Sequence, residues 1–335
     1  MGMDVLRKEP ASQDLTIPVR FPHRVNQHPD RALDREQYWG RHYGIAASEP
    51  SRWEKVSAYR PATLITHANP DAEGEVYDLL VDEMCFYVYL DDLIDEVFFE
   101  DPGGASSFIG KIADVLDEDI ARTRLDRSIP AVAMFDDVWT RCVGLMSWKW
   151  RHRAAGHWLD YLWGNLTETI DRYRRTTPTD LDMYLQTRRG SIAMTNCQDK
   201  HEIVHGFELP ARVLRQPVLQ RLLRLLTDLV IVGNDLVSYE KEDSIGDAYN
   251  SVLLLRDHHG MTLVEAVEHV TGLATGYANQ IDKIHRDLPD VLNDIDPAAR
   301  ETTLIWEEHA RLWVGGFTAW QALAPRYNPP RAAEA

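Results

Sequence analysis

The sequence predicts an all-α protein that forms a single domain. Apolar residues recur three and four positions apart over long stretches, which is the spacing that places them on one face of a helix. The alternation of strands and helices that builds a parallel sheet does not occur, and no internal repeat of about 20 to 50 residues is evident. Since no linker divides the middle of the chain, one helical domain is favoured over two.

Turn signals containing proline or glycine separate the expected helices. These signals are Asp101-Pro102-Gly103-Gly104, Thr177-Pro178, Leu209-Pro210, His259-Gly260 and Asp296-Pro297. The expected helical stretches run roughly over 30–45, 72–100, 105–122, 130–175, 179–207, 210–242, 247–259, 261–289 and 297–323. Residues 1–28 are expected to be irregular, residues 29–324 to form the helical domain, and residues 325–335 to form a tail over it.

Composition and charge are those of a globular protein with a sizeable core. Of 335 residues, 44% are hydrophobic and 27% are charged. The formal net charge is −17, so a nucleic-acid partner is not expected, and a diphosphate would approach this chain only with metal ions between them. We therefore look for a small-molecule site that contains cations.

Cysteine usage and the termini point to the cytoplasm. Cys85, Cys142 and Cys197 are widely spaced and odd in number, which is typical of reduced thiols rather than of a disulfide framework or a zinc site. No secretory signal is visible, and no apolar run reaches about 18 residues, so no membrane span is expected. The oligomeric state, monomer or homodimer, stays open.

One short segment carries most of the chemical information. Asn234, Ser238 and Glu242 are spaced four residues apart, so on a helix they share one narrow face. Their amide, hydroxyl and carboxylate oxygens are hard ligands of the kind that Mg²⁺ prefers. Lys241 adds a cation suited to a phosphate oxygen. This face predicts a Mg²⁺ site that handles a phosphorylated ligand.

A second acidic cluster lies far upstream. Asp91, Asp92 and Asp95 follow an apolar run from Met84 to Leu90, and Asp91 and Asp95 are one helical turn apart. The helix is therefore expected to be buried until its carboxylates begin. Two oxygen-rich faces on separate helices suggest a Mg²⁺ cluster that binds a polyphosphate.

These residues resemble the motifs of the bacterial class I terpene synthases. Asn234-Asp235-x-x-Ser238-x-x-Lys241-Glu242 is similar to the NSE triad of that family, and Asp91-Asp92-Leu93-Ile94-Asp95 to its aspartate-rich motif. Two weaker similarities occur at the expected distances from these motifs. Arg188 lies 46 residues before Asn234, where the family keeps a pyrophosphate-sensing arginine, and Arg326-Tyr327 resembles its C-terminal RY pair. The resemblance extends from about residue 20 to residue 328.

The resemblance implies a single helical bundle around a deep apolar cavity, with both metal motifs at its mouth. Three Mg²⁺ ions would bind the diphosphate, with Asp91 on one side and the triad of Asn234, Ser238 and Glu242 on the other. Asp92 is expected to pair with Arg188, and Asp95 to be an outer ligand. The diphosphate would accept hydrogen bonds from a set of four residues: Arg188, Lys241, Arg326 and Tyr327.

The resemblance also implies an aromatic cavity wall, because aromatic faces stabilise a migrating positive charge. The candidate lining residues are Phe86, Tyr87, Val88, Ile192, Trp306, Trp313, Phe317 and Trp320. Ser191 and Ile192 occupy the linker and effector positions after the sensor arginine. Ile192 is bulkier than the glycine that the family often has there. Arg189, next to Arg188, is an alternative sensor.

A second motif points elsewhere. His201-Glu202-Ile203-Val204-His205 has the H-E-x-x-H pattern of zinc metalloproteases. The extended form of that motif requires glycine at 208 and histidine at 211, where this chain has Glu208 and Ala211. In a chain with 13 histidines, we interpret the match as a coincidence.

The predicted activity is ionisation and cyclisation of a linear isoprenyl diphosphate by a carbon–oxygen lyase. The alternatives are a prenyl-chain elongating transferase, a zinc hydrolase built on His201 and His205, and a non-catalytic helical scaffold. Elongating enzymes carry two aspartate-rich motifs, and here the second is replaced by the NSE pattern, which favours cyclisation. Farnesyl diphosphate is placed slightly ahead of geranylgeranyl diphosphate. The product, and whether the last cation loses a proton or takes up water, cannot be read from the sequence.

Overall fold

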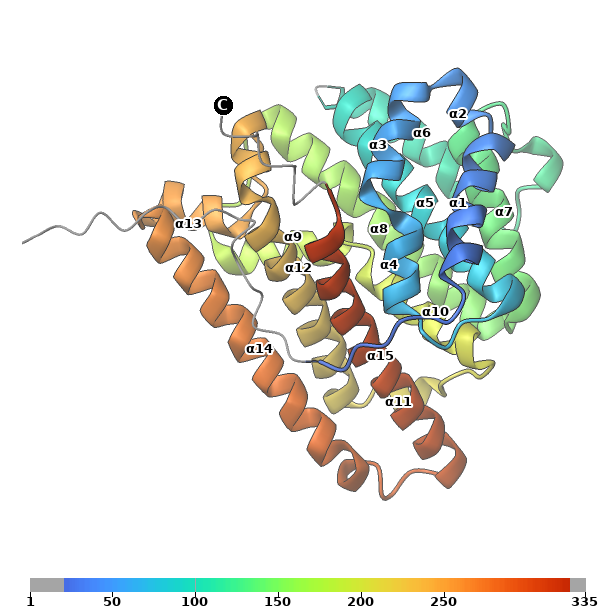
Figure 1. The fold of residues 1–335 in the computed structure, drawn as a ribbon, viewed down its shortest axis with the longest axis vertical. Helices are drawn as coiled ribbons and strands as arrows, with labels where there is room; N and C mark the ends of the chain where they lie inside the picture. Colours follow the sequence, from blue (N-terminus) through green and yellow to red (C-terminus); the bar gives the residue numbers. More distant parts are fainter. Residues whose placement is uncertain (1–20, 100, 326–335) are drawn as a thin grey trace, which may run out of the picture.

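The all-α prediction is confirmed. A computed structural model of the protein describes residues 21–99 and 101–325, and within these residues the chain forms α-helices, one short 3-10 helix and no β-strand. In Figure 1, helices α1 to α7 lie on one side of the molecule, and helices α12 to α15 lie on the other. The result is a bundle of helices around a shared interior.

The helices are, in chain order, α1 (Pro29–His42), α2 (Ile45–Ser48), α3 (Pro50–Tyr59), α4 (Pro61–Ala68), α5 (Gly74–Val97), α6 (Pro102–Ala113), the 3-10 helix η2 (Arg122–Arg124), α7 (Pro130–Leu145), α8 (Trp148–Arg174), α9 (Leu181–Ser191), α10 (Met194–His205), α11 (Ala211–Leu214), α12 (Pro217–Ile245), α13 (Ser251–His259), α14 (Leu263–Val291) and α15 (Pro297–Leu323).

Proline and capping residues explain where the helices begin. A proline occupies the first turn of α1, α3, α4, α6, α7, α12 and α15, where its missing N–H removes no hydrogen bond. In α8, α9, α13 and α14 a side chain caps the first turn. Asn250 accepts hydrogen bonds from the amides of Val252 and Leu253, and Thr262 forms a capping box with Glu265.

The observed helices differ from the expected ones in several places. Sequence periodicity missed α3 and α4, because each is too short to show a sustained period. The expected stretch 130–175 is two helices, since α7 ends at Leu145 with Met146 as its C-cap and Ser147 caps α8. The stretch 179–207 is also two helices, because Ala193 adopts a left-handed conformation (φ 56°) between α9 and α10.

Helix α5 lies at the centre of one half of the bundle. Every residue from Leu79 to Leu90 is buried, and the helix contacts α1, α3, α4, α7, α8 and α10. The two charges in this run are paired: Asp82 with Arg35 and Arg141, and Glu83 with Lys200. A helix that is buried all round holds its exposed end, which carries Asp91, in a fixed place.

The other half of the bundle is built on α12 and α15. Helix α12 lies against α13, α14 and α15, and α14 runs along the outer edge in Figure 1. Helix α15 crosses α4 at Gly316, where a Cβ atom would overlap the carbonyl oxygen of His67 and lie 2.7 Å from Cα of Ala68. The absence of a side chain at Gly316 therefore allows the two helices to approach each other.

Across the residues that the structure describes, we find no helix with both the length and the apolar content required to cross a lipid bilayer.

Replacing Gly316 by alanine should destabilise the fold. The added methyl would force α15 away from the α4 backbone, and overpacking of this kind costs about 1–3 kcal/mol of the free energy of unfolding. Gly272 is the matched control, because it also lies inside a helix, α14, but has nothing within 4 Å of an added Cβ. Gly272→Ala should instead stabilise the protein by about 0.5–1 kcal/mol. Urea denaturation measures both, and equal shifts would contradict the close contact.

Candidate active site

Helix α5 carries the first acidic wall of the site. Asp91 and Asp95 line an interior cavity that opens where the buried part of α5 ends. Asp92 points differently, and the hydroxyl of Tyr59 on α3 donates to its Oδ1 at 3.4 Å. The one-turn spacing of Asp91 and Asp95 therefore places both carboxylates in one cavity.

Helix α12 carries the opposite wall. Asn234 and Glu242 line the same cavity, and Ser238 is buried between them in sequence. The side-chain amide of Asn250 donates to Oε2 of Glu242 at 2.7 Å and lies 3.4 Å from Oγ of Ser238. Both predicted metal faces thus meet at one cleft, with Asn250 fixing the second face.

Two arginines lie between the walls. On α8, Arg172 donates to Asp95 at 3.1 Å and to Asp247 at 3.0 and 3.2 Å. On α9, Nη1 of Arg188 donates to Oε1 of Glu168 at 2.9 Å. Glu168 also lies 3.4 Å from Arg172, so the two arginines are joined through one carboxylate. This network connects α5, α8, α9 and the end of α12 around the mouth of the cavity.

The predicted pairing of Asp92 with Arg188 is wrong in this structure. Arg188 pairs with Glu168 and contacts Oγ of Ser191 at 3.1 Å. Asp92 is on the face of α5 that turns toward α3, whereas Glu168 lies one turn before Arg172 on the helix against which α9 packs. Sequence spacing did not identify Glu168 as the partner of Arg188, because the two residues are 20 positions apart on different helices.

Burial raises the pKa of the wall carboxylates. It raises the pKa of Asp91 to about 6, with Asp92 adding to the effect, and the pKa of Asp95 to about 7, with Asp91 adding. Burial also raises the pKa of Glu242 to about 8, and the buried carboxylate of Asp235 contributes. In each case low dielectric disfavours the charged form and a like charge disfavours it further. The positive charges nearby do not offset these two effects.

The donor set fits divalent cations. Among the described residues, five carboxylates and two arginines line the cavity, an excess of three negative charges if all are ionised: the acids are Asp91, Asp95, Glu168, Glu242 and Asp247. Within residues 21–99 and 101–325, no three His, Cys, Asp or Glu side chains come close enough to hold a metal by themselves. A cation would therefore also need the amide and hydroxyl oxygens of Asn234 and Ser238, or oxygens from a ligand.

Beneath the carboxylates the cavity is apolar and aromatic. Residues that share this character line it: Met84, Tyr87, Val88, Tyr161, Ile192, Cys197, Val230, Trp313, Phe317 and Trp320. On α15, the rings of Trp313 and Phe317 stack at 5.6 Å, and those of Phe317 and Trp320 lie 5.5 Å apart. The predicted lining positions 87, 88, 192, 313, 317 and 320 are therefore in the cavity wall.

Two predicted lining residues do not reach the cavity. The ring of Phe86 stacks on Phe135 of α7 at 5.3 Å. Trp306 is fully buried beside His201, and its Nε1 donates to the carbonyl oxygen of Gln198 at 3.2 Å. Both are core residues. Phe86 lies on the face of α5 that is turned away from the cavity. Trp306 lies about two turns before Trp313, where the cavity lining on α15 begins.

A break in the helix shapes the wall beside Arg188. Helix α9 ends at Ser191, and Ile192 and Ala193 then face the cavity before α10 begins. Gly164 of α8 permits this arrangement, because a Cβ there would lie 2.7 Å from the carbonyl carbon of Gly190. The two glycines bring α8 and α9 together at the break, which places Glu168 opposite Arg188.

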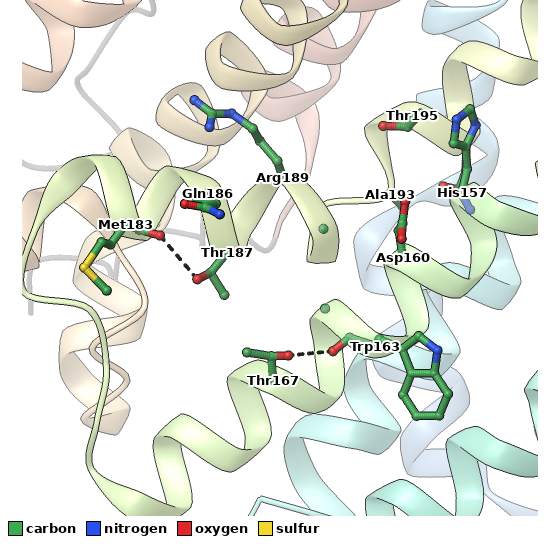
Figure 2. A pocket seen from close by; sticks show the side chains of 13 residues that line it. His157, Asp160, Trp163, Thr167, Met183, Gln186, Thr187, Arg189, Ala193 and Thr195 are labelled. Carbon is green, nitrogen blue, oxygen red and sulfur yellow. Dashed lines mark hydrogen bonds between the residues drawn. The ribbon is translucent and has the colours of Figure 1, made fainter.

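The alternative sensor, Arg189, faces away from this cavity. It donates to both carboxylate oxygens of Asp228, at 2.6 and 2.9 Å. Arg189 lines a separate pocket of about 670 Å³. Figure 2 shows this pocket, with Thr187 of α9 on one side and Thr167 of α8 on the other. The acidic walls do not reach that pocket, so Arg188 is the arginine in the position that the sequence motif requires.

The remaining predicted diphosphate ligands lie at or beyond the rim. Lys241 is exposed, yet it is near enough to lower the pKa of Asp91 and of Asp92, against the raising effect of burial. It therefore sits at the mouth, facing α5. Arg326 and Tyr327 lie outside the described residues.

The zinc-site interpretation is contradicted. His201 is completely buried, and neither ring nitrogen has a hydrogen-bond partner among the described residues. Its ring stacks on His309 at 4.3 Å, while Nε2 of His205 bonds Nδ1 of His309 at 2.8 Å. Glu202 is bound by Arg153 and by the amide of Leu209. The motif contributes to the core and presents no ligand set to a substrate.

Several residues of the site were not predicted from the sequence. Glu168 and Arg172 carry a weak signal, an acid and a base one helical turn apart on α8. Asp247 and Asn250 follow the glycine that ends α12 and precede α13, so they belong to a turn that the motifs do not include. Opposite charges one helical turn apart are common on helix surfaces, and only burial distinguishes the pair of Glu168 and Arg172 from these.

A family model described as terpene synthase family 2, C-terminal metal binding, matches residues 82–279. Pristinol synthase from Streptomyces pristinaespiralis is 29% identical over 96% of this chain and 86% of its own. A (−)-β-caryophyllene synthase from Saccharothrix espanaensis, named as cyclising (2E,6E)-farnesyl diphosphate, is 31% identical over 77% of this chain and 72% of its own. The crystal structure of germacradien-4-ol synthase from Streptomyces citricolor aligns with a TM-score of 0.81 and 25% identity, over 93% of this chain and 99% of that one.

The buried histidines should make the protein sensitive to acid. Burial, and then the neighbouring His205, lowers the pKa of His309 to about 3; burial and His309 lower the pKa of His201 well below its ordinary 6.5. Below about pH 6.5 the unfolded chain takes up protons that the folded chain excludes. The stability is therefore complete above that pH and is lost progressively as the pH falls toward about 3.

Urea denaturation of His201→Phe at pH 7 and pH 5 measures this effect. The variant should lose less stability between the two pH values than the wild type, because one proton fewer is taken up on unfolding. His269→Phe, on the exposed face of α14, is the control and should keep the wild-type difference. A His201→Phe variant with the full wild-type pH dependence would contradict the buried, neutral state of His201.

Proposed function

Because the chain belongs to terpene synthase family 2, we propose that it ionises and cyclises a linear isoprenyl diphosphate with Mg²⁺, releasing inorganic diphosphate. Family membership makes the chain a bacterial class I terpene synthase, a lyase that acts on prenyl diphosphates. The observation that carries the proposal is the meeting of Asp91 and Asp95 with Asn234 and Glu242 at the mouth of one apolar cavity.

The two walls would hold three Mg²⁺ ions. Asp91 supplies oxygen ligands from α5, with Asp95 as an outer ligand, and the triad of Asn234, Ser238 and Glu242 supplies them from α12. When bound, the ions supply Lewis-acid charge that stabilises the departing diphosphate. The excess of acidic over basic side chains in the cavity supports this assignment, and so does the metal-binding description of the family model.

The chain's own cations would bind the diphosphate oxygens. Arg188 lines the cavity, and its Nε is buried without a hydrogen-bond partner in the described part of the chain, so it has a donor left for a ligand oxygen. Glu168 and Ser191 hold the rest of the guanidinium in place. Lys241 would reach the diphosphate from the rim, joined by Arg326 and Tyr327. Donors fixed before the reaction stabilise charge as it develops on the leaving group.

The cavity below would guide the cation that ionisation leaves. Tyr87, Trp313 and Phe317 present rings to its interior, and aromatic faces attract positive charge. The apolar wall also excludes water from the space that the isoprenyl chain fills, which prevents early quenching of the cation. Cyclisation follows when the chain is held folded against this wall.

Farnesyl diphosphate is the proposed substrate, ahead of geranylgeranyl diphosphate. The named activity of the β-caryophyllene synthase relative supports the C15 chain. Val88 leaves room beside Tyr87 on α5, but the stacked rings of Trp313 and Phe317 limit the cavity from α15. The depth between these two helices would set the longest chain accepted.

Removing a metal ligand should abolish turnover without unfolding the protein. Asp91→Asn and Glu242→Gln each keep the side-chain shape and remove a charge, so diphosphate release should fall by at least about a hundredfold. A phosphate-coupled assay with Mg²⁺ measures release, and circular dichroism measures helix content, which should not change. His201→Phe is the control, since His201 lies outside the cavity, and should keep nearly full activity. Substantial release by Asp91→Asn would contradict the proposed metal role.

Substrate length can be tested directly with geranyl, farnesyl and geranylgeranyl diphosphates. The wild type should show its highest kcat/KM with farnesyl diphosphate. Val88→Phe fills the space beside Tyr87, so it should reduce kcat/KM for the longer substrates more than for geranyl diphosphate. Mass spectrometry of the extracts identifies the products. A wild-type preference for geranylgeranyl diphosphate would contradict the C15 assignment.

A further inference from the structure

The wall of the cavity carries a clamped tyrosine below the acidic mouth. Tyr87 lies on α5 one turn before Asp91, and its ring stacks on Trp158 at 4.9 Å and meets Tyr161 edge-on at 5.2 Å. Its hydroxyl lies 3.4 Å from Oε1 of Glu83, a further turn along the helix. The ring is thus held in one orientation, with the hydroxyl directed away from the mouth.

The cavity reaches the depth of this hydroxyl. Met84, which lies one turn before Tyr87 on α5, lines the cavity, and so does Cys197 of α10. Eight residues separate Asp91 from Glu83, which corresponds to about 12 Å along a helix. A cation formed near this end of the isoprenyl chain lies far from the diphosphate oxygens at the mouth, so those oxygens are poorly placed to accept a proton from it.

A buried ion pair stands behind the tyrosine. Oε1 of Glu83 and Nζ of Lys200 are 2.7 Å apart, and these residues are only 3% and 2% exposed. The Lys200 ammonium also lies 5.8 Å from the ring of Trp150 and 5.6 Å from that of Trp158. Burying such a pair is often no more stabilising than apolar side chains of the same volume, because desolvation offsets the attraction. Stability alone therefore does not explain a carboxylate at this place.

We propose that Tyr87 and Glu83 form a proton-accepting pair at the deep end of the cavity, which takes the proton lost by the final carbocation. The inference rests on the proposed cyclisation and concerns its last step. A C–H bond next to the cationic carbon breaks, and its electron pair forms the C=C bond of the product. The proton bonds to Oη of Tyr87 as the phenolic proton passes to Oε1 of Glu83.

The surroundings favour this transfer. Lys200 favours the ionised form of Glu83, while burial raises the pKa of that carboxylate and so makes it a stronger base than an exposed one. After the step Glu83 is neutral, the Lys200 ammonium remains, and total charge is conserved. Departure of the product opens the cavity to water, to which the proton returns by the reverse path through Tyr87.

The test compares product distributions in Tyr87→Phe, Glu83→Gln and the control Tyr89→Phe, which removes a buried hydroxyl from the same helix at a residue outside the cavity lining, where that hydroxyl contacts Glu49. Farnesyl diphosphate and Mg²⁺ are supplied, diphosphate release gives total turnover, and gas chromatography with mass spectrometry gives the products. In Tyr87→Phe and Glu83→Gln, diphosphate release should persist, while the wild-type olefin falls at least about tenfold relative to double-bond isomers and water-capture alcohols. Tyr89→Phe should retain the wild-type olefin as its main product.

Glu83→Gln is the decisive variant, because Glu83 lies behind the wall and its loss leaves the shape of the cavity unchanged. Since it strands the Lys200 charge and could unfold the protein, Glu83→Gln/Lys200→Gln, which leaves no lone charge, is measured beside it and should show the same product change. A change in Tyr87→Phe alone, with wild-type ratios in the Glu83 variants, would overturn the pair and leave Tyr87 as a shape determinant. Wild-type ratios in every variant would overturn it as well. No diphosphate release by the wild type would instead contradict the proposed function.

Discussion

The structure depends on a buried cleft that holds more acidic than basic side chains. Helix α5 is apolar and enclosed up to Leu90, and helix α12 is largely buried up to Tyr239, so both present their carboxylates at the point where the core ends. Asp91, Asp95 and Glu242 are then held in low dielectric with two arginines between them. Packing in the rest of the fold stabilises this arrangement. The excess of acidic side chains makes the cleft a suitable site for cations.

Hydrogen bonds from uncharged donors hold the second wall in position. Asp235, next to the first ligand of the triad, accepts from the hydroxyl of Tyr184 at 2.8 and 2.9 Å and from Oγ of Ser251 at 2.6 Å. Asn250 caps α13 and also holds Glu242. The end of α12 is thereby tied to α9 and α13. The donors that fix this wall carry no charge, so they do not act as counter-ions to its carboxylates.

The mouth and the deep end of the cavity differ in how their charged groups are arranged. In the proposed reaction, the donors and acids at the mouth would serve a leaving group that gains negative charge as it departs. At the deep end, the charges of Glu83 and Lys200 stand behind the apolar wall near Tyr87 and balance each other. In the proposed reaction, a cation that moved from one end to the other would pass aromatic faces that stabilise it without offering a covalent partner.

Local periodicity in the chain is enough to predict the helical class and which residues share each of the two acidic faces, because a 3.6-residue period fixes which positions of one helix share a side. The spacing alone therefore groups Asp91 with Asp95, and Asn234 with Glu242. It does not identify the partner of Asp92, show that Phe86 and Trp306 belong to the core, or predict that Glu83 pairs with Lys200. Those facts depend on how α3, α7, α8 and α10 rotate and approach one another. Such contacts join residues far apart in the chain, so they are settled by the packing of whole helices and not by any local pattern.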